Sequence, residues 1–470
     1  MDEKKTSVMQ YEHVVRVCIE SSTPLSIQGG DIINTEDANI LTDSNGLPMI
    51  PGKTLRGTLR ALYKQAYENP ENDCTNKLWG YQDTAKGQAS NISIDFAVVH
   101  DSKNSPATGL LSQQDITNDT LLSYLQSLQT TPLLRERNAI NARGAVKDGV
   151  YYNFAIAPKG LRYTFEISYE TNEETCPTEL TRILSLIKSP LFRLGSYHHK
   201  NLGAFNIISL KHYLIDNTNQ ESIDGYPCTI SNDANFKDIT DTVEINHSLS
   251  KKESTYTLNA VDFWRIGAGT ESFSGIEKQP DMLPLSEPVI EWEEGNFAKI
   301  KTMIILPGTA ILGPLAHRLD FHYRCEKGEF VSEDNISSDK LFKEQRTDAT
   351  NALFGKKTDH ENSKGHAGII SINDIYLDPK TWCAKDKIGQ QIHNKISHHL
   401  GGTIDSALFS EELLYQTEVT IAILELKEIP VDYSDAWKTT LDDFLNNRLA
   451  IGAASGRGHG YFQASTEVPA

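Results

Sequence analysis

One short pattern occurs twice in this chain, and it limits the folds that the chain can adopt. The first copy, Gly46 to Tyr63, reads GLPMIPGKTLRGTLRALY, and the second, Met303 to Arg318, reads MIILPGTAILGPLAHR. In each copy an extended apolar run meets a Pro-Gly turn, after which spaced apolar residues predict a helix. The two Pro-Gly turns lie 256 positions apart. A repeated element of this length predicts a duplicated chain.

Other elements recur in the same order. Ile140 and Ile396 lie 256 positions apart, and Gly195 and Gly452 lie 257 apart. Each half is expected to contain a strand, a helix, a strand, a hairpin, a strand, a helix and a strand. This order favours an α+β fold, a split βαβ or ferredoxin-like sheet with helices on one face. We predict domains at residues 1–213 and 251–470, joined by the acidic linker 214–250.

Charge and composition restrict the possible partners. The net charge is −18, which argues against sequence-blind nucleic-acid binding over the whole surface. A local basic groove is still possible, because exposed charges are screened over about 8 Å at physiological salt. The N-terminus has no signal-peptide pattern, and no apolar run approaches the roughly 20 residues that span a bilayer. The six cysteines form no CxxC pair, so we expect a cytoplasmic protein without a membrane partner.

The first Pro-Gly helix has cations in its first two turns. A helix N-terminus already favours anions, so these cations predict a phosphate-binding surface. The alternative is an amphipathic helix with a solvated basic face. In the second copy the three cations are replaced by Thr309, Leu312 and Ala316, with His317 and Arg318 following. The predicted RNA-binding residues are Lys53, Arg56 and Arg60 in the first helix, and His317 and Arg318 in the second.

Two further kinds of segment are candidates for RNA contact. A glycine-rich loop closes each half, reading RLGSYHHKNLGAF (193–205) and LAIGAASGRGHGYF (449–462). Neither loop has the GxxxxGK[ST] order of a nucleotide-binding P-loop. The adjacent histidines do not have metal-ligand spacing, and we interpret them as loop residues near phosphate. The candidates in the closing loops are Arg193, Lys200, Arg457 and His459; those in the hairpins are Arg143, Lys147 and His398.

These motifs together resemble a known family. The set comprises IPGKTLRGTLR, LWG or LFG, the strand ISINDIYL, a glycine-rich hairpin and the closing GRGHG. It is similar to the RAMP superfamily of CRISPR proteins, and most of all to the Cas-seven-type backbone subunits of type III effector complexes. The resemblance covers nearly all of both halves. Two such units in one chain look like the fused backbone subunits of type III-D complexes.

The resemblance implies a fold and partners. Each half would be a ferredoxin-like, RRM-like (RAMP) domain that holds guide RNA. A thumb hairpin inserted in each half, Asn138 to Phe154 and His393 to Phe409, would kink the duplex of guide and target. The implied partners are guide (CRISPR) RNA, target single-stranded RNA and other CRISPR effector subunits.

The resemblance also implies chemistry. Asp37 and Asp43 stand six positions apart before LPMIPG, as in the family pattern, in which the first carboxylate is needed to cleave target RNA. An ionised aspartate is suited to hold a divalent metal, and we expect Mg²⁺ at Asp37. The alternative is that Asp37 only caps a turn. In the second half Asp281 and Glu287 repeat the spacing, so Asp281 is a second catalytic candidate.

Three functions are compatible with the sequence. The first is a metal-dependent endoribonuclease that is also a guide-RNA-binding backbone subunit. The second is a scaffold that binds RNA without cleaving it. The third is a guide-RNA-processing endoribonuclease, which would rely on a histidine near the first strand, where the chain offers only His13.

Overall fold

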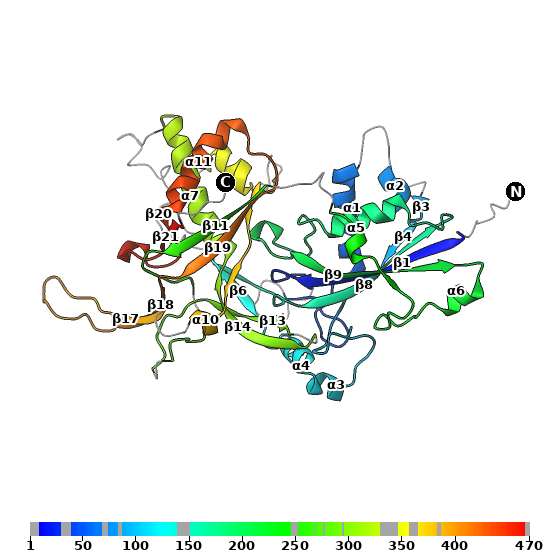
Figure 1. The fold of residues 1–470 in the computed structure, drawn as a ribbon. Coiled ribbons are helices and arrows are strands. Elements are labelled where there is room, and N and C mark those ends of the chain that lie inside the picture. The colour runs from blue at the N-terminus through cyan, green and yellow to red at the C-terminus, as the bar shows by residue number, and fades with distance from the viewer. Residues whose placement is uncertain are drawn as a thin grey trace.

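Each half of the chain forms a sheet that is covered by helices, as Figure 1 shows. None of the described helices is long and apolar enough to cross a membrane. The computed structural model describes residues 9–29, 39–67, 74–82, 87–138, 151–245, 252–267, 269–275, 278–293, 296–329, 346–356, 365–382 and 387–465.

The first-half sheet is antiparallel, with the order β10-β9-β1-β8-β4, and β5 pairs with β8. Apart from the edge strand β10, the order is fourth-first-third-second in chain sequence, which is the ferredoxin-like arrangement that the repeat predicts. Helices α1 and α5 pack against each other. The bounds are β1 Tyr11–Ser21, β4 Ile92–Ile94, β5 Val98–Val99, β8 Arg162–Thr171, β9 Phe205–Asp216, β10 Lys237–Asp238, α1 Gly52–Tyr67 and α5 Thr178–Ile187.

The second-half sheet repeats this topology. Its order is β15-β19-β11-β21-β20, which is second-third-first-fourth with one further edge strand. Helices α7 and α11 pack on each other beside it. The bounds are β11 Lys252–Ala260, β15 Ile370–Ile372, β19 Glu418–Glu425, β20 Asn446–Ala450, β21 Tyr461–Ala464, α7 Gly308–Glu326 and α11 Val431–Leu445.

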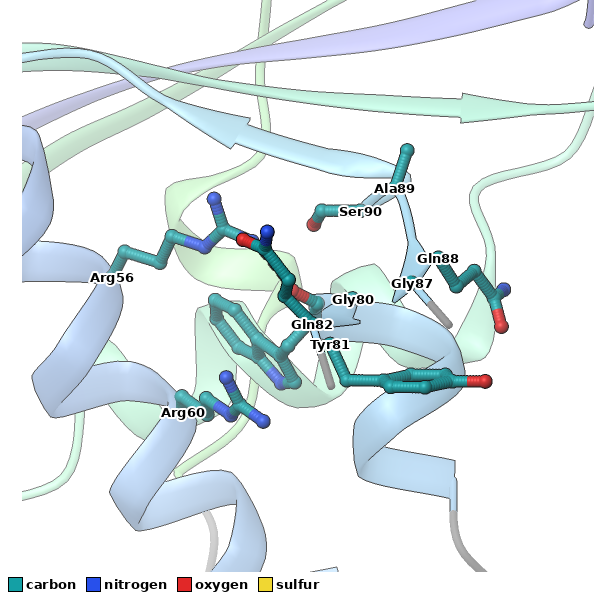
Figure 2. A pocket seen from close by; sticks show the side chains of 10 residues that line it. Arg56, Arg60, Gly80, Tyr81, Gln82, Gly87, Gln88, Ala89 and Ser90 are labelled. Carbon is teal, nitrogen blue, oxygen red and sulfur yellow. Dashed lines mark hydrogen bonds between the residues drawn. The ribbon is translucent and has the colours of Figure 1, made fainter. Parts of the chain in front are cut away.

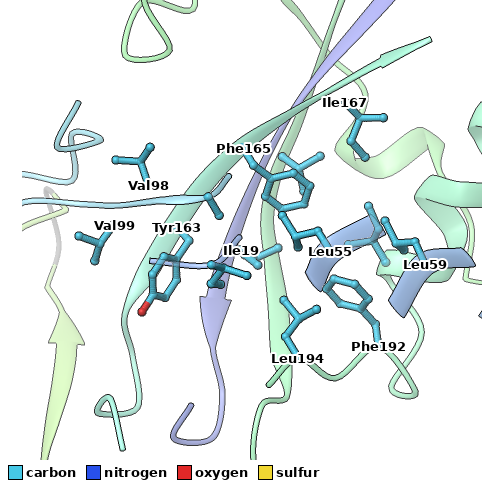
Figure 3. Packing of buried hydrophobic residues seen from close by; sticks show 14 of the residues in the cluster. Ile19, Leu55, Leu59, Val98, Val99, Tyr163, Phe165, Ile167, Phe192 and Leu194 are labelled. Carbon is cyan, nitrogen blue, oxygen red and sulfur yellow. The ribbon is translucent and has the colours of Figure 1, made fainter. Parts of the chain in front are cut away.

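Apolar spacing explains how the Pro-Gly helices attach to the sheets. Leu55, Leu59 and Leu62 lie on one face of α1 because they recur every three or four residues, and all three are buried. Figure 3 shows Leu55 and Leu59 beside Phe165 of β8, in the first-half core. In α7 the residues that correspond to Leu55 and Leu59, Ile311 and Leu315, are buried in the second-half core.

Smaller elements surround the two sheets. The hairpin β2–β3 follows α2, and two short helices, α3 and α4, lie between β5 and β6. Strands β6 and β7 form the base of the first expected thumb, whose tip at 139–150 lies outside the described residues; β17 and β18 flank the second. The bounds are α2 Cys74–Trp79, β2 Tyr81–Gln82, β3 Gly87–Gln88, α3 Gln113–Asn118, α4 Thr120–Ser127, β6 Leu134–Arg137, β7 Tyr152–Ala155, α6 Gln220–Asp224, β12 Phe263–Trp264, β13 Ser286–Trp292, β14 Ala298–Leu306, α9 Asp348–Phe354, β16 Ile375–Leu377, α10 Pro379–Trp382, β17 Ile388–His393 and β18 Phe409–Tyr415.

The acidic segment after β9 packs on the first half in its described part. Strand β10 adds to the edge of the sheet, and Val243 is buried in the first-half core. Arg16 of β1 is 2% exposed; it pairs with Glu166 at 2.6 Å and donates to the carbonyl of Pro227 at 2.6 Å. Residues 214–245 therefore extend the first half, and the domain boundaries themselves stay a prediction.

The two halves meet through backbone contacts at β13. This strand includes the apolar part of the acidic stretch EPVIEWEEGN, and it pairs with β14. Trp292 Nε1 donates to the carbonyl of Gly160 at 2.7 Å, and the N–H of Ile290 donates to the carbonyl of Lys159 at 2.9 Å. Gly160 has φ +90°, and a Cβ there would lie 1.9 Å from the Ile290 oxygen. Only glycine fits this contact.

Candidate nucleic-acid interface

A pocket of about 690 Å³ opens between α1 and the β2–β3 hairpin. Figure 2 shows the side chains of Arg56 and Arg60 extending from α1 toward Tyr81 and Gln82 of the hairpin. Two of the three cations that the sequence predicted on this helix therefore share one cavity. The residues that line it are Arg56, Arg60, Trp79, Gly80, Tyr81, Gln82, Gly87, Gln88, Ala89 and Ser90.

Local sequence explains why the pocket forms. The apolar face of α1 is buried, so the arginines at 56 and 60 are on the other side of the helix, one turn apart. Gly80 turns the chain from α2 into the hairpin with φ +69°, and a Cβ there would lie 2.7 Å from the Gln88 oxygen. At the start of α1, a Cβ at Gly52 would lie 2.3 Å from the Ile94 oxygen, so the helix begins against the sheet.

Neutral oxygens hold both guanidinium groups. Arg56 Nη2 donates to the Trp79 carbonyl at 2.5 Å, and Arg60 Nη2 donates to Asn76 Oδ1 at 3.1 Å. Within the described residues neither arginine has a carboxylate within ion-pair distance. Among the described residues, Arg137, Arg182, Arg193 and Arg346 likewise have no carboxylate within ion-pair distance. The eight described arginines that do pair with carboxylates are Arg16, Arg135, Arg162, Arg265, Arg318, Arg324, Arg448 and Arg457.

The remaining predicted cations on the two Pro-Gly helices lie elsewhere. Lys53 is exposed at the start of α1 and does not line the pocket. Arg318 on α7 pairs with Asp443 of α11 at 2.6 Å, and so joins two helices. His317 is half-buried on α7. The second helix therefore has no arginine pair like that of α1.

The closing loop of the first half contacts the second half. Arg193 donates to Asn373 Oδ1 at 3.0 Å, and burial lowers its pKa to about 10. Asn201, next to the predicted Lys200, bonds to Ile372 and Ser371. The Lys200 ammonium lies 4.4 Å from the ring centroid of Tyr152. Both predicted cations of this loop therefore have protein partners in the structure.

The closing loop of the second half surrounds a buried carboxylate. Glu411 of β18 is fully buried; Arg457 Nη2 lies 2.6 Å from one of its oxygens, and Arg265 Nη2 lies 3.2 Å from the other. The third neighbour is His393, whose Nε2 lies 2.7 Å from Oε1 of Glu411. His459 is buried nearby, and burial lowers its pKa. His398 lies apart from this cluster, exposed in the turn between β17 and β18.

Three of the predicted site residues lie outside the described part of the chain: the carboxylate Asp37 and the cations Arg143 and Lys147. Asp281 is exposed, and its Oδ2 accepts hydrogen bonds from the N–H and hydroxyl of Ser410 at 2.8 and 2.9 Å, which lower its pKa. Asp43 accepts from the N–H groups of Asn45 and Leu47, each at 2.9 Å, so it stabilises a turn. Among the described residues no three His, Cys, Asp or Glu side chains converge on a metal site.

The histidine of the third candidate function is buried in the sheet. His13 is 0% exposed; its Nδ1 lies 3.0 Å from His212 Nε2, and its Nε2 lies 3.0 Å from the Glu173 carbonyl. A substrate phosphate cannot reach an imidazole that is enclosed in this way. The sequence did not predict that the β2–β3 hairpin, with Tyr81, forms one side of the pocket; Gly80, which precedes Tyr81, could have indicated the turn. The sequence also did not predict that Arg135 pairs with residues of the second half.

Comparison with known proteins places the chain in one family. A search of curated proteins finds no match. A family model described as the RAMP superfamily matches residues 18–204 and again 257–463. The first match ends just before β9, the second contains most of the second-half sheet, and together they cover most of the chain. The chain therefore belongs to the RAMP superfamily, with two copies of the family unit in tandem.

Proposed function

We propose that this protein is a guide-RNA-binding backbone subunit of a type III CRISPR effector complex, each half contacting the RNA. The observation that carries the proposal is the pocket formed by α1 and the β2–β3 hairpin, in which Arg56 and Arg60 lack carboxylate partners among the described residues. The duplicated RAMP unit supports it. Guide RNA, target single-stranded RNA and further effector subunits are the proposed partners.

The pocket is chemically suited to RNA phosphate. A guanidinium presents five N–H donors in a planar fork that matches phosphate oxygens. Arg56 and Arg60 each use one described donor on a neutral oxygen, which fixes the side chain without neutralising its charge. With a net charge of −18, repulsion of RNA elsewhere on the surface would direct binding to such local basic sites.

The catalytic part of the proposal is cleavage of target RNA at Asp37 with a divalent metal, Mg²⁺. It rests on the family resemblance and on the spacing of Asp37 and Asp43. Asp281 is less suited to this role, because both hydrogen bonds from Ser410 fall on one of its oxygens and tie it to β18. The other candidate, a scaffold that binds RNA without cleaving it, would share every binding property and lack only this step.

The proposal is tested by purifying the chain and extracting its RNA. We expect a discrete small RNA with the parent protein, and a clear loss of it with the double variant Arg56→Glu, Arg60→Glu. The slope of log affinity against log salt should also decrease, by about 0.9 for each lost duplex phosphate contact. The matched control is Lys252→Glu, Lys438→Glu, which reverses the same charge at exposed sites. Equal losses in both variants would contradict the proposed interface.

A further inference from the structure

We propose that the pocket between α1 and the β2–β3 hairpin binds a single unpaired nucleotide, with its phosphate on Arg56 and Arg60 and its base against Tyr81. This inference rests on the proposed RNA binding, and adds to it a base contact and a stoichiometry of one nucleotide per chain. The pocket volume of about 690 Å³ is within the ~300–1,000 Å³ range that small-molecule sites occupy.

The β2–β3 hairpin provides an aromatic ring and two amide side chains for contact with a base. Tyr81 is 41% exposed, although large aromatic residues are more often buried. An exposed aromatic ring at a cationic site is a stacking surface for a base. The side chains of Gln82 and Gln88 are exposed on the same hairpin. Each carries a donor and an acceptor, which is the complement needed to bond with the polar edge of a base.

Trp79 forms the closed inner wall of the pocket. It lines the pocket and is 0% exposed, so its Nε1 is not within reach of a ligand. Ser90 beside it already donates to the Leu78 and Ile92 carbonyls. The arginines and the exposed hairpin side chains are therefore the groups that a ligand can contact.

The arginine spacing favours one phosphate over an extended strand. Arg56 and Arg60 are one helical turn apart, so their side chains are neighbours, and both line the same cavity. A paired base is covered on both faces by its neighbours in the duplex, and only an unpaired base leaves a face free for Tyr81. The second half has Leu312 and Ala316 at the positions of the two arginines, so we assign one such pocket to each chain.

The test measures binding of adenosine monophosphate, inorganic phosphate and a short single-stranded RNA to the full chain by titration calorimetry. We expect one monophosphate per chain, bound about tenfold more tightly than phosphate alone. Tyr81→Ala should remove this advantage, because it removes the stacking surface, while Tyr81→Phe should keep it. Displacement of the nucleotide by the RNA would assign the pocket to an RNA nucleotide. Failure of the RNA to displace it would assign the pocket to a free nucleotide instead, and both results support the base contact.

Two results would overturn the inference. Equal affinity for phosphate and nucleotide, unchanged in Tyr81→Ala, would leave only an anion site. No nucleotide binding by the chain after its RNA has been removed, while a guide RNA co-purifies with the untreated chain, would refute the pocket and leave the proposed function intact. Loss of co-purified RNA in Arg56→Glu, Arg60→Glu, with Tyr81→Ala behaving as the parent in every titration, would likewise keep the function and exclude the base contact.

Discussion

Arg135 of the first half and Glu287 of the second half form a buried two-pronged ion pair, with Nε to Oε1 at 2.6 Å and Nη2 to Oε2 at 2.7 Å. The third nitrogen of the guanidinium, Nη1 of Arg135, donates to Oδ2 of Asp374 at 2.6 Å. Asp374 in turn accepts from the N–H of Gly308 at 2.9 Å, at the start of α7. Burial opposes the charge of Arg135, but Asp374 and Glu287 hold its pKa well above the ordinary value. One first-half cation thus forms ion pairs with two second-half carboxylates.

Removing this arginine should destabilise the protein strongly. Arg135→Met leaves Glu287 and Asp374 buried without their cation. Removing one partner of a buried ion pair typically lowers the free energy of unfolding by ~3–5 kcal/mol. The control is Arg448→Met, whose side chain is 60% exposed and whose loss should cost ~0–1 kcal/mol. Urea unfolding followed by circular dichroism measures both. A cost for Arg135→Met no larger than that of the control would contradict a role in joining the halves.

Two glycine substitutions should have opposite effects. Gly160→Ala forces a Cβ to within 1.9 Å of the Ile290 oxygen at a backbone with φ +90°, so the contact between the halves must open and stability should fall. Gly57→Ala places a Cβ in α1 with nothing within 4 Å, and should stabilise by ~0.5–1 kcal/mol through helix propensity. Thermal melting of the two variants measures the difference. A melting temperature for Gly160→Ala at or above the parent value would refute the close contact.

The histidine pair in the first sheet should make stability depend on pH. Burial first, and then the charges of His13 and Lys237, lower the pKa of His212 to about 4, whereas an unfolded histidine titrates near ~6.5. The unfolded chain therefore binds more protons between these values. This contribution to stability is complete above pH ~6.5 and is lost as the pH falls toward ~4.

The comparison that isolates this effect uses His212→Gln, which cannot gain a proton. The free energy of unfolding, measured in urea at pH values from about 4 to 7, should fall less steeply with acid in the variant than in the parent protein. Identical slopes would mean that other groups cause the acid sensitivity.

Cleavage, if Asp37 performs it, should be separable from binding. Asp37→Ala is expected to remove one cut in target RNA while guide loading stays near normal, because the carboxylate serves the reaction and not the fold. Asp281→Ala should leave that cut unchanged, since Asp281 bonds to Ser410. End-labelled target RNA on a sequencing gel shows each cut. A cut that survives Asp37→Ala and vanishes with Asp281→Ala would reverse the assignment.

The sequence predicted those features that local pattern determines. The repeat of the Pro-Gly helix and the sequence of elements predicted two ferredoxin-like sheets, whereas the order of the strands within each sheet is known from the structure alone. The apolar spacing of α1 also predicted which face of the helix is buried, with Arg56 and Arg60 beside it. This helix face depends on residues within a few turns of one another, which is the range that periodicity covers.

The rest depends on partners distant in the chain. Arg135 and Glu287 are separated by 152 positions, and nothing in the local sequence of either indicates the other. Glu287 fitted a catalytic spacing with Asp281, yet its position in β13 beside the first half makes it a structural ion-pair partner. The stretch around it is acidic, yet it forms a strand because it pairs with β14 and buries Ile290 in the first-half core.

The acidic segment after β9 has a consequence for solubility. Its strand β10 consists of Lys237 and Asp238 alone, both exposed, at the outer edge of the first sheet. A short, charged edge strand offers few free backbone groups to a strand of another molecule, and natural sheets use such strands to prevent edge-to-edge aggregation. The residues that look like a linker in the sequence thus protect the middle of this edge, at Lys211 and His212 of β9, against unwanted strand addition.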